Sequence, residues 1–270
     1  MSVGAPWALL RDVPDSFRDC VTRRLADPPL DPRRARRQHA GYRTALETGG
    51  FCTRLLPADE AHPDCCFIED TAILLAGAAL ATRPGHPSRR GEVAAVAEAL
   101  RAMLPLDAVE PPATLDGGDV LRVGRRLFVG ASARTNPAGR EALARWAAPL
   151  GFEVVPVALH GVLHLKSAVT ALDEQTLLLF PGAMDEEAFR GLRLVEVSGG
   201  DPEAANVVRL PDGRILVAAH LPQSADAVRA AGFVPLACDV AEFGRADGGL
   251  TCLSLRCRSG AAAGPAAGSF

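Results

Sequence analysis

The sequence predicts an α/β fold built as a ring of five similar units, and three observations support this prediction. Four stretches follow the order strand, tight turn, strand that is typical of a β-hairpin. Helical patterns lie between the hairpins. Polar or special residues open each unit, and they recur 49, 47, 40 and 46 residues apart at Asp70, Asp119, Lys166, Asn206 and Cys252. Because one such unit is too small to bury a core alone, a closed ring is the economical arrangement.

Each hairpin is predicted from two apolar runs that flank a turn signal. The signals include Gly77 in the first hairpin, "DE" at 173–174 in the third and "PDG" at 211–213 in the fourth. The first strand of each hairpin is expected to face the central axis, so that the polar openings converge there. The four hairpins are expected at residues 67–84, 115–132, 164–182 and 204–220.

Helices are expected at three places outside the hairpins. Residues 87–104 carry apolar side chains at helical spacing, and residues 136–151 form a second helical pattern. In "DPRRARRQHA", Asp31 and Pro32 indicate a helix start. The arginines that follow are expected to form a solvated helix face rather than a nucleic-acid site.

The two ends of the chain are expected to close the ring. The fifth unit ends after one strand, "TCLSLRC" at 251–257, while "WALLRDVP" at 7–14 begins the chain with a strand that has no assigned partner. We therefore expect these strands to pair within one domain spanning residues 1–258. The tail at 259–270, "SGAAAGPAAGSF", is of low complexity and is expected to be disordered.

Composition excludes several functional classes. The net charge of −3 and the 5% aromatic content argue against nucleic-acid binding, and the partner is expected to be a small molecule. The start of the chain has no pattern of a signal peptide, and the longest apolar run, at 71–81, is well short of the roughly 20 residues of a membrane helix. Seven cysteines without regular spacing indicate free thiols, so a cytoplasmic protein is expected.

The ring would gather the chemically active openings at its axis. There a thiol, Cys252, could be deprotonated by an imidazole, His164, which Asp116 would orient. The remaining carboxylates would repel one another unless a cation lies between them, and a guanidinium matches carboxylates in geometry. The expected central residues are Glu69, Asp70, Asp116, Asp119, His164, Lys166, Asn206 and Cys252.

Each of these residues also has a structural interpretation. A histidine between leucines, such as His164, often belongs to the core, and "DGGD" at 116–119 is ordinary turn chemistry. Arg89 and Arg134 fit surface positions at helix ends. Adjacent Cys65 and Cys66 lack the C-x2-C spacing of a structural zinc site, so we expect no metal.

Six motifs, in order, resemble the dimethylarginine dimethylaminohydrolase family. They are "PDCCFIEDTAIL", "TRPGHPSRR", "ATLDGGDVL", "FVGASARTN", "VLHLKS" and "DGGLTCLSL", and the resemblance extends from about residue 7 to 257. It implies the pentein fold, a five-bladed α/β propeller. It also implies hydrolysis of Nω-methylated arginines to citrulline and an amine through a covalent cysteine thiouronium intermediate, without a metal or organic cofactor.

The same resemblance implies a role for each matching residue. Cys252 matches the nucleophile, His164 the general acid and base, and Asp116 the acidic member of the triad. Asp70, with Glu69 beside it, matches the carboxylate that binds the guanidinium. The residues that match positions at the amino-acid end of the substrate are Arg89 and Arg134 for the α-carboxylate, Asp64 for the α-amino group and Ala246 through its backbone, while Phe17 falls where the family usually carries a leucine in a mobile lid.

Two alternatives remain open at this stage. One is a related arginine or agmatine deiminase; arginine deiminases typically carry an aspartate two residues after the histidine, where this chain has Lys166. Agmatine has no α-carboxylate, so it would leave Arg89 and Arg134 unexplained. The other is a non-catalytic propeller that binds a macromolecule, but such a protein has no need of a thiol, an imidazole and carboxylates in register. A monomer or a homodimer is equally compatible with the sequence.

Overall fold

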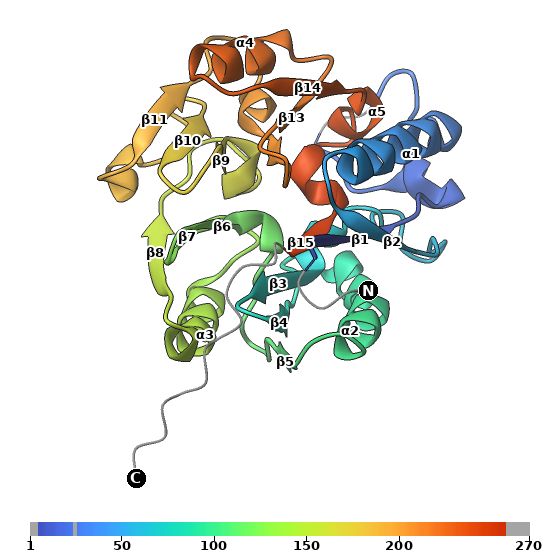
Figure 1. The fold of residues 1–270 in the computed structure, drawn as a ribbon. Helices are drawn as coiled ribbons and strands as arrows, with labels where there is room; N and C mark the ends of the chain where they lie inside the picture. The colour runs from blue at the N-terminus through green and yellow to red at the C-terminus, as the bar shows by residue number, and fades with distance from the viewer. Residues whose placement is uncertain (1–4, 24–25, 258–270) are drawn as a thin grey trace.

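Five three-stranded sheets surround a central axis, as the repeat predicted (Figure 1). The structure, a computed structural model, describes residues 5–23 and 26–257. The predicted tail at 259–270 lies outside the described residues. Each sheet follows one pattern: two antiparallel strands, and a third strand that runs parallel to its neighbour. The fold is therefore the five-bladed α/β propeller that the sequence indicated.

All four predicted hairpins are present, and each provides the first two strands of a sheet. They are β3 (Ala72–Leu75) with β4 (Ala78–Ala81), β6 (Val120–Val123) with β7 (Arg126–Gly130), β9 (Val169–Ala171) with β10 (Thr176–Leu179), and β12 (Val208–Arg209) with β13 (Ile215–Ala218). The third strands were not predicted. They are β5 (Leu106–Ala108), β8 (Glu153–Val157), β11 (Arg193–Glu196) and β14 (Pro235–Cys238).

The strands near the two ends of the chain close the ring in the predicted way. Strand β1 (Trp7–Arg11) lies between β15 (Leu255–Cys257) and β2 (Cys52–Leu56). It pairs antiparallel with β15, where Trp7 lies opposite Cys257. Both ends of the chain thus contribute to the fifth sheet.

Helices connect the second and third strands in four of the five units. Parallel strands cannot be joined by a tight turn, so a crossover is required. The crossovers are α1 (Pro32–Thr48), α2 (Val93–Arg101), α3 (Pro137–Ala147) and α4 (Pro222–Ala230), and a short α5 (Ala241–Gly244) follows β14. In the third unit, whose residues are all described, the 3-10 turn η7 (Glu186–Phe189) takes the helix's place.

Helix boundaries differ in part from the predictions. Asp31 caps α1 by accepting from the backbone amide of Arg33, as its position before Pro32 indicated. The helix expected at 87–104 is shorter: residues Pro87–Glu92 form a 3-10 turn, η3, and α2 begins only at Val93. Within the described residues, no helix is long and apolar enough to cross a bilayer.

A short 3-10 turn precedes the first strand of every unit. These turns are η2 (Ile68–Thr71), η4 (Gly117–Asp119), η6 (Leu165–Ser167), η8 (Pro202–Ala205) and η9 (Leu250–Leu253). Four of the five recurring polar markers lie within a turn of this kind: Asp70, Asp119, Lys166 and Cys252. The fifth, Asn206, directly follows η8. The repeat in the sequence therefore corresponds to a repeated turn and not to a repeated strand residue.

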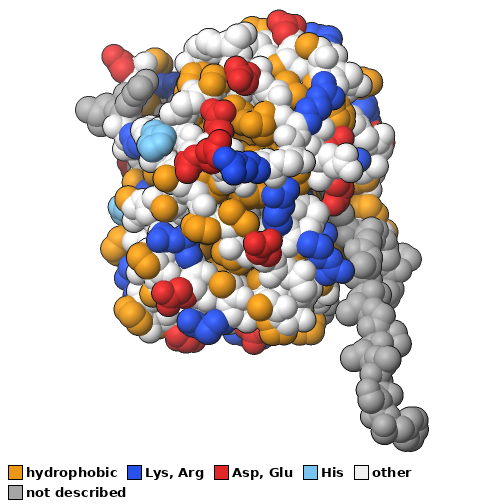
Figure 2. Space-filling view, turned by 90° about the vertical axis from the view of Figure 1, so that its left-hand side faces the viewer, with side chains coloured by type: hydrophobic (Ala, Val, Ile, Leu, Met, Phe, Trp, Pro, Cys, Tyr) orange, Lys and Arg blue, Asp and Glu red, His pale blue; other side chains and the backbone are white. Residues whose placement is uncertain are grey.

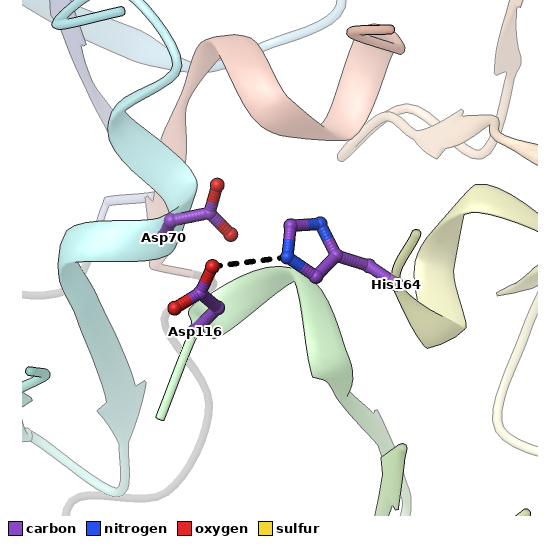
Figure 3. A group of neighbouring side chains, drawn as sticks. All are labelled: Asp70, Asp116 and His164. Carbon is purple, nitrogen blue, oxygen red and sulfur yellow. Dashed lines mark hydrogen bonds and ion pairs between the residues drawn. The ribbon is translucent and has the colours of Figure 1, made fainter. Parts of the chain in front are cut away.

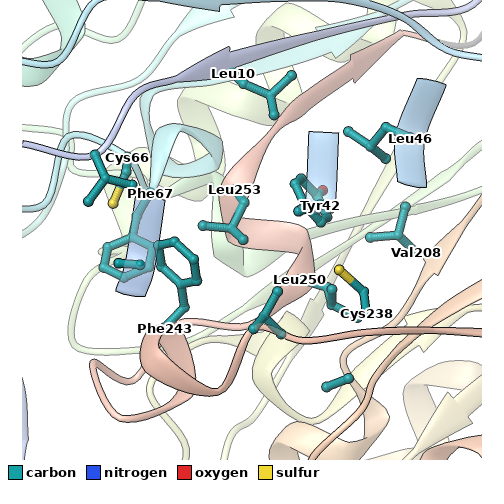
Figure 4. Packing of buried hydrophobic residues seen from close by; sticks show 14 of the residues in the cluster. Leu10, Tyr42, Leu46, Cys66, Phe67, Val208, Cys238, Phe243, Leu250 and Leu253 are labelled. Carbon is teal, nitrogen blue, oxygen red and sulfur yellow. The ribbon is translucent and has the colours of Figure 1, made fainter. Parts of the chain in front are cut away.

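Among the described residues, the largest cluster of buried hydrophobic side chains lies between α1, α5 and the fourth and fifth sheets (Figure 4). Phe67 and Phe243 lie side by side in it with ring centroids 6.1 Å apart. Phe17 completes this aromatic group at 6.1 Å from Phe67 and 5.6 Å from Phe243, and its exposed fraction is 0%. Phe17, which falls where the family usually carries a leucine in a mobile lid, thus packs in this core.

Candidate active site

Hydrogen bonds join the five 3-10 turns into a closed circuit around the axis. Three markers accept from a backbone amide of the next turn: Asp70 from Gly118 at 2.8 Å, Asp119 from Leu165 at 3.1 Å, and Asn206 from Thr251 at 2.9 Å. Two side-chain bonds complete the circuit. The Asn206 amide donates to the Lys166 carbonyl at 2.8 Å, and the Thr251 hydroxyl donates to Glu69 at 2.8 Å. The turns that carry the candidate residues are thus fixed relative to one another.

His164 and Asp116 form a buried pair at the centre of this circuit (Figure 3). The His164 Nε2 atom lies 3.0 Å from Asp116 Oδ2. Burial alone would lower the pKa of His164, but the charge of Asp70, the hydrogen bond to Asp116 and the charge of Asp119 outweigh it and raise the pKa to about 9. His164 is therefore protonated at neutral pH.

Asp70 lies beside this pair and remains ionised. Its Oδ1 atom accepts from the Gly118 amide, and its Oδ2 atom accepts from Arg89 Nη1 at 2.5 Å. Burial would raise the pKa of Asp70, yet the charges of His164 and Arg89 bring it well below the usual range. A carboxylate has about four acceptor positions, so Asp70 retains capacity for a cationic ligand.

Cys252 lies within η9, the turn that the circuit holds through Thr251 and Asn206. Its side chain is partly exposed. Burial, followed by the charges of Glu69 and Asp70, raises the pKa of the Cys252 thiol to about 12. Without a ligand the thiol is therefore neutral at physiological pH.

Two of the predicted central carboxylates each accept three hydrogen bonds from the protein itself. Glu69 accepts from Lys166 Nζ at 2.5 Å, from Thr251 at 2.8 Å and from Arg256 at 3.3 Å. Asp119 accepts from the hydroxyl groups of Ser132 and Thr135 and from the Leu165 amide. Both carboxylates therefore support neighbouring turns, and Asp119 fixes the turn next to His164.

Lys166 and Glu69 also line a large cavity between the inner strands of the sheets. The cavity has a volume of about 970 Å³ and is lined by the inner strands of the sheets, including Leu74, Leu121 and Thr170. Its lining reaches Glu69 and Lys166 but does not include His164, Asp116 or Cys252. It is thus distinct from the candidate site.

The two arginines expected at the substrate's α-carboxylate both lie next to central carboxylates. Arg134 Nη1 is 3.8 Å from Asp116 Oδ2, beyond hydrogen-bond distance, and this buried atom has no hydrogen-bond partner among the described residues. Arg89 is more fully engaged, with bonds to Asp70, to both oxygens of Glu92 and to the Phe67 carbonyl. Arg134 therefore has a buried Nη1 donor without a partner among the described residues, whereas every nitrogen of the Arg89 guanidinium donates at least one hydrogen bond.

The segment after Phe17 approaches the predicted residues at the amino-acid end of the substrate. The Val21 amide donates to both oxygens of Asp64 at 3.2 Å, and burial raises the pKa of Asp64 although Arg89 opposes it. Arg23 forms an ion pair with Asp247, next to the buried Ala246. Sequence reasoning missed Val21 because it acts through its backbone, and it missed Arg256 because its partner Glu69 lies 187 residues away. Glu92 pairs with Arg89, three residues before it, but the sequence alone does not show that this pair is buried.

One group of side chains among the described residues has the spacing of a metal site. It consists of Asp70, Asp116 and His164, whose donor atoms lie within 4.8 Å of one another (Figure 3). Asp70 is already paired with Arg89, and Asp116 with His164. Both carboxylates of the group therefore already have an ion-pair partner in the protein.

Comparison with known proteins gives close relatives but no matching family model. The chain is 42% identical over 225 residues to the N(G),N(G)-dimethylarginine dimethylaminohydrolase of Streptomyces coelicolor, across 82% of this chain and 85% of that protein. The Pseudomonas aeruginosa protein of the same name is 32% identical over 228 residues, across 84% and 89% of the two chains.

Solved structures agree with this similarity. A dimethylarginine dimethylaminohydrolase from Pseudomonas aeruginosa, complexed with citrulline, matches with a TM-score of 0.87 at 30% identity, across 93% of this chain and 99% of that chain. The N-terminal domain of the arginine dihydrolase ArgZ, from cyanobacteria, matches with a TM-score of 0.82 at 22% identity, across 93% and 97%. At that identity the second likeness shows the fold alone.

Proposed function

Because the chain belongs to the dimethylarginine dimethylaminohydrolase family, we propose that it hydrolyses Nω-methylated arginines to citrulline and dimethylamine or methylamine. The observation that carries this proposal is the protonated, buried His164–Asp116 pair beside the ionised Asp70. This arrangement provides a proton donor next to a carboxylate that a guanidinium can bind. The Cys252 thiol, on a turn of the same circuit, supplies the nucleophile.

The first half of the reaction forms a covalent intermediate. A guanidinium next to Asp70 adds positive charge near Cys252, which lowers the pKa of a thiol that Glu69 and Asp70 otherwise raise. The thiol proton leaves to solvent, since His164 is already protonated. The Cys252 thiolate then attacks the central guanidinium carbon, and the C–N bond breaks as His164 transfers its proton to the departing amine.

The second half restores the thiolate. His164 is neutral after it has protonated the amine, so it can accept a proton from water as that water attacks the thiouronium carbon. Collapse of the resulting adduct breaks the C–S bond with the electron pair staying on the sulfur, the hydroxyl proton of the adduct passes to solvent, and citrulline is released. Asp116 stabilises the imidazolium that forms again and keeps the ring oriented. The proposed mechanism requires no redox step, so it uses only this chain's own groups and water.

The amino-acid end of the substrate has matching donors and acceptors. The unpartnered Nη1 atom of Arg134 and the remaining Nη1 proton of Arg89 are our candidates for the α-carboxylate. Asp64 is the candidate for the α-amino group, with the Ala246 backbone beside it. Phe17 is buried, so we propose that it supports this region by packing and does not contact the substrate.

The test is citrulline release from purified protein in the presence of a metal chelator. Asymmetric dimethylarginine, monomethylarginine, arginine and agmatine are supplied separately. We expect citrulline from the two methylated substrates and not from arginine. Citrulline from arginine would instead indicate a deiminase, and carbamoylputrescine from agmatine would remove the proposed role of Arg89 and Arg134. No turnover of any substrate would favour a binding protein.

The charge distribution on the surface also favours a small-molecule partner over a nucleic acid. The chain has a net charge of −3, and on the face shown in Figure 2 acidic and basic side chains are interspersed. An even mixture of charges gives little attraction for a nucleic-acid backbone. All seven cysteines are free, which supports a reducing, cytoplasmic location. Action as a monomer or homodimer away from membranes stays a prediction.

A further inference from the structure

The guanidinium of Arg89 is buried between two carboxylates. Its Nη1 donates to Asp70 Oδ2 at 2.5 Å, while its Nε and Nη2 donate to the two oxygens of Glu92 at 3.0 and 2.7 Å. Nη2 also donates to the Phe67 carbonyl at 2.9 Å. Arginine has five N–H groups, so within the described chain these bonds leave one N–H, on Nη1. Two of the four bonds go to Glu92, so this residue makes the largest single contribution to the orientation of Arg89.

Glu92 is itself firmly placed and lies away from the reacting groups. It ends the 3-10 turn η3 directly before α2, and its exposed fraction is 1%. Its backbone carbonyl accepts from Arg11 Nη1 at 3.2 Å, which ties this turn to β1. Both carboxylate oxygens face Arg89. Such a fixed, two-point contact orients a planar guanidinium more strictly than a single bond does.

The charges of Asp70, Arg89 and Glu92 together determine how strongly Asp70 attracts a cation. Asp70 and Glu92 each carry a negative charge when ionised, and Arg89 carries the positive charge between them. Together the three side chains then have a net charge of −1. Asp70 is the member of the three that lies beside the His164–Asp116 pair, so a cation bound there meets this negative charge. If Glu92 were neutral, the sum would be zero, and the positive charge of Arg89 would balance the negative charge of Asp70.

We propose that Glu92 is a positioning residue of the guanidinium site, acting through Arg89 to keep Asp70 available and negative for the cationic head of the substrate. The inference rests on the proposed function and extends it to a residue outside the substrate contacts. Its consequence is selective: Glu92 strengthens the binding of a guanidinium and has little effect on a neutral group in the same place.

A pair of ligands with identical amino-acid ends separates these effects. Asymmetric dimethylarginine carries a guanidinium, and citrulline carries a neutral ureido group. Binding is measured by calorimetry in a Cys252→Ser variant, which avoids turnover. The pH is 8, because burial raises the pKa of Glu92 to about 7 although Arg89 opposes the shift. We expect an added Glu92→Gln substitution to raise the Kd of dimethylarginine about tenfold or more, and that of citrulline less than about threefold.

The matched control is Glu98→Gln, which removes the same charge from an exposed position of α2. We expect it to leave both Kd values unchanged. Equal losses for the two ligands would show that Glu92 acts on the amino-acid end or on the fold as a whole, and no loss for either would show that it acts on neither; both results overturn the inference. If Glu92→Gln does not fold, Glu92→Asp is used, for which we expect a smaller loss that is still confined to dimethylarginine.

The same experiment separates this inference from the proposed function. If the Cys252→Ser parent binds neither ligand, the proposed function fails and the inference fails with it. If the parent binds dimethylarginine and citrulline but Glu92→Gln weakens both equally, the proposed function stands and the role of Glu92 alone is overturned.

Discussion

The His164 imidazole lies 3.0 Å from Asp116, and both side chains are buried. Asp116 Oδ1 also accepts from the Gly85 amide at 2.7 Å, so the carboxylate cannot rotate freely. The pair is therefore held in one orientation, and the charge of Asp116 contributes to the raised pKa of His164.

Asp116→Asn tests this relationship. An amide that keeps the bond to Gly85 presents its NH2 group to His164 Nε2, which favours the neutral imidazole. We expect the pKa of His164 to fall below its value of about 9, and kcat to fall about 100-fold or more because the proton donor is lost. An NMR titration of the imidazole and steady-state kinetics measure the two effects.

Asp226→Asn is a suitable control for that experiment. Asp226 is an exposed residue of α4 that pairs with Arg229, so its loss is expected to leave both quantities unchanged. A His164 that titrates as in the unmodified protein, with kcat intact, would contradict the assignment of Asp116.

The state of the Cys252 thiol gives a second prediction. Because its pKa is raised to about 12 in the empty site, thiolate absorbance at 240 nm should show no contribution from Cys252 at pH 7 to 9. Subtraction of a Cys252→Ser spectrum isolates this contribution from the other six cysteines. A Cys252-dependent thiolate signal near pH 7 would mean that the free enzyme already holds an ion pair, and that the substrate charge is not needed to form the nucleophile.

The ring could be predicted from the sequence because its signals are local. Alternating apolar residues and turn residues such as Gly77 identify each hairpin without knowledge of its neighbours. The third strands could not be identified in this way. Strand β5, for example, has three residues, two of them exposed, and it pairs with β4 only after the α2 crossover brings it back. Its signal lies in contacts distant in sequence.

The candidate site likewise has features that the sequence predicts and features that depend on contacts between distant segments. The repeat predicted that His164, Asp116 and Asp70 would converge, and they do. The sequence could not show which carboxylates the protein itself would neutralise. Lys166 reaches Glu69 from 97 residues away, and this pairing depends on side-chain length and packing that appear only in the folded chain. Glu69 was therefore expected to be free for a guanidinium, whereas it has three partners in the structure.

Asn206 provides a third prediction, about the circuit itself. Its side-chain amide makes three hydrogen bonds: a partly buried one to the Lys166 carbonyl, and buried ones to the hydroxyl and the backbone amide of Thr251. Asn206→Ala removes all three bonds and leaves the Thr251 amide without its acceptor, so we expect a loss of about 2–4 kcal/mol in the free energy of unfolding. Urea denaturation measures it. The exposed Gln175→Ala is the control, and a loss no larger than in that variant would show that the circuit is not needed for stability.

His39 provides the last prediction, which concerns acid stability. This residue of α1 is buried beside Tyr42 and Phe243, and its Nε2 atom has no hydrogen-bond partner among the described residues. Burial lowers the pKa of His39 from 6.5 to about 4. Between these two pH values the unfolded chain binds a proton that the folded protein does not, so stability falls as the pH drops from 6.5 to 4, by roughly 3 kcal/mol from this group.

A phenylalanine at position 39 removes that proton while it keeps a ring in the core. We therefore expect His39→Phe to match or exceed the parent in stability at pH 7, and to lose less stability on acidification, because the remaining loss comes from the carboxylates that both proteins share. Urea denaturation at pH 7, 5.5 and 4.5 provides the comparison, with the exposed His160→Asn as the control. The prediction is contradicted if the free energy of unfolding of the parent and of His39→Phe falls equally over this pH range. The folded protein would then bind a proton at His39 as readily as the unfolded chain does, and a charged imidazole would be tolerated beside Tyr42 and Phe243.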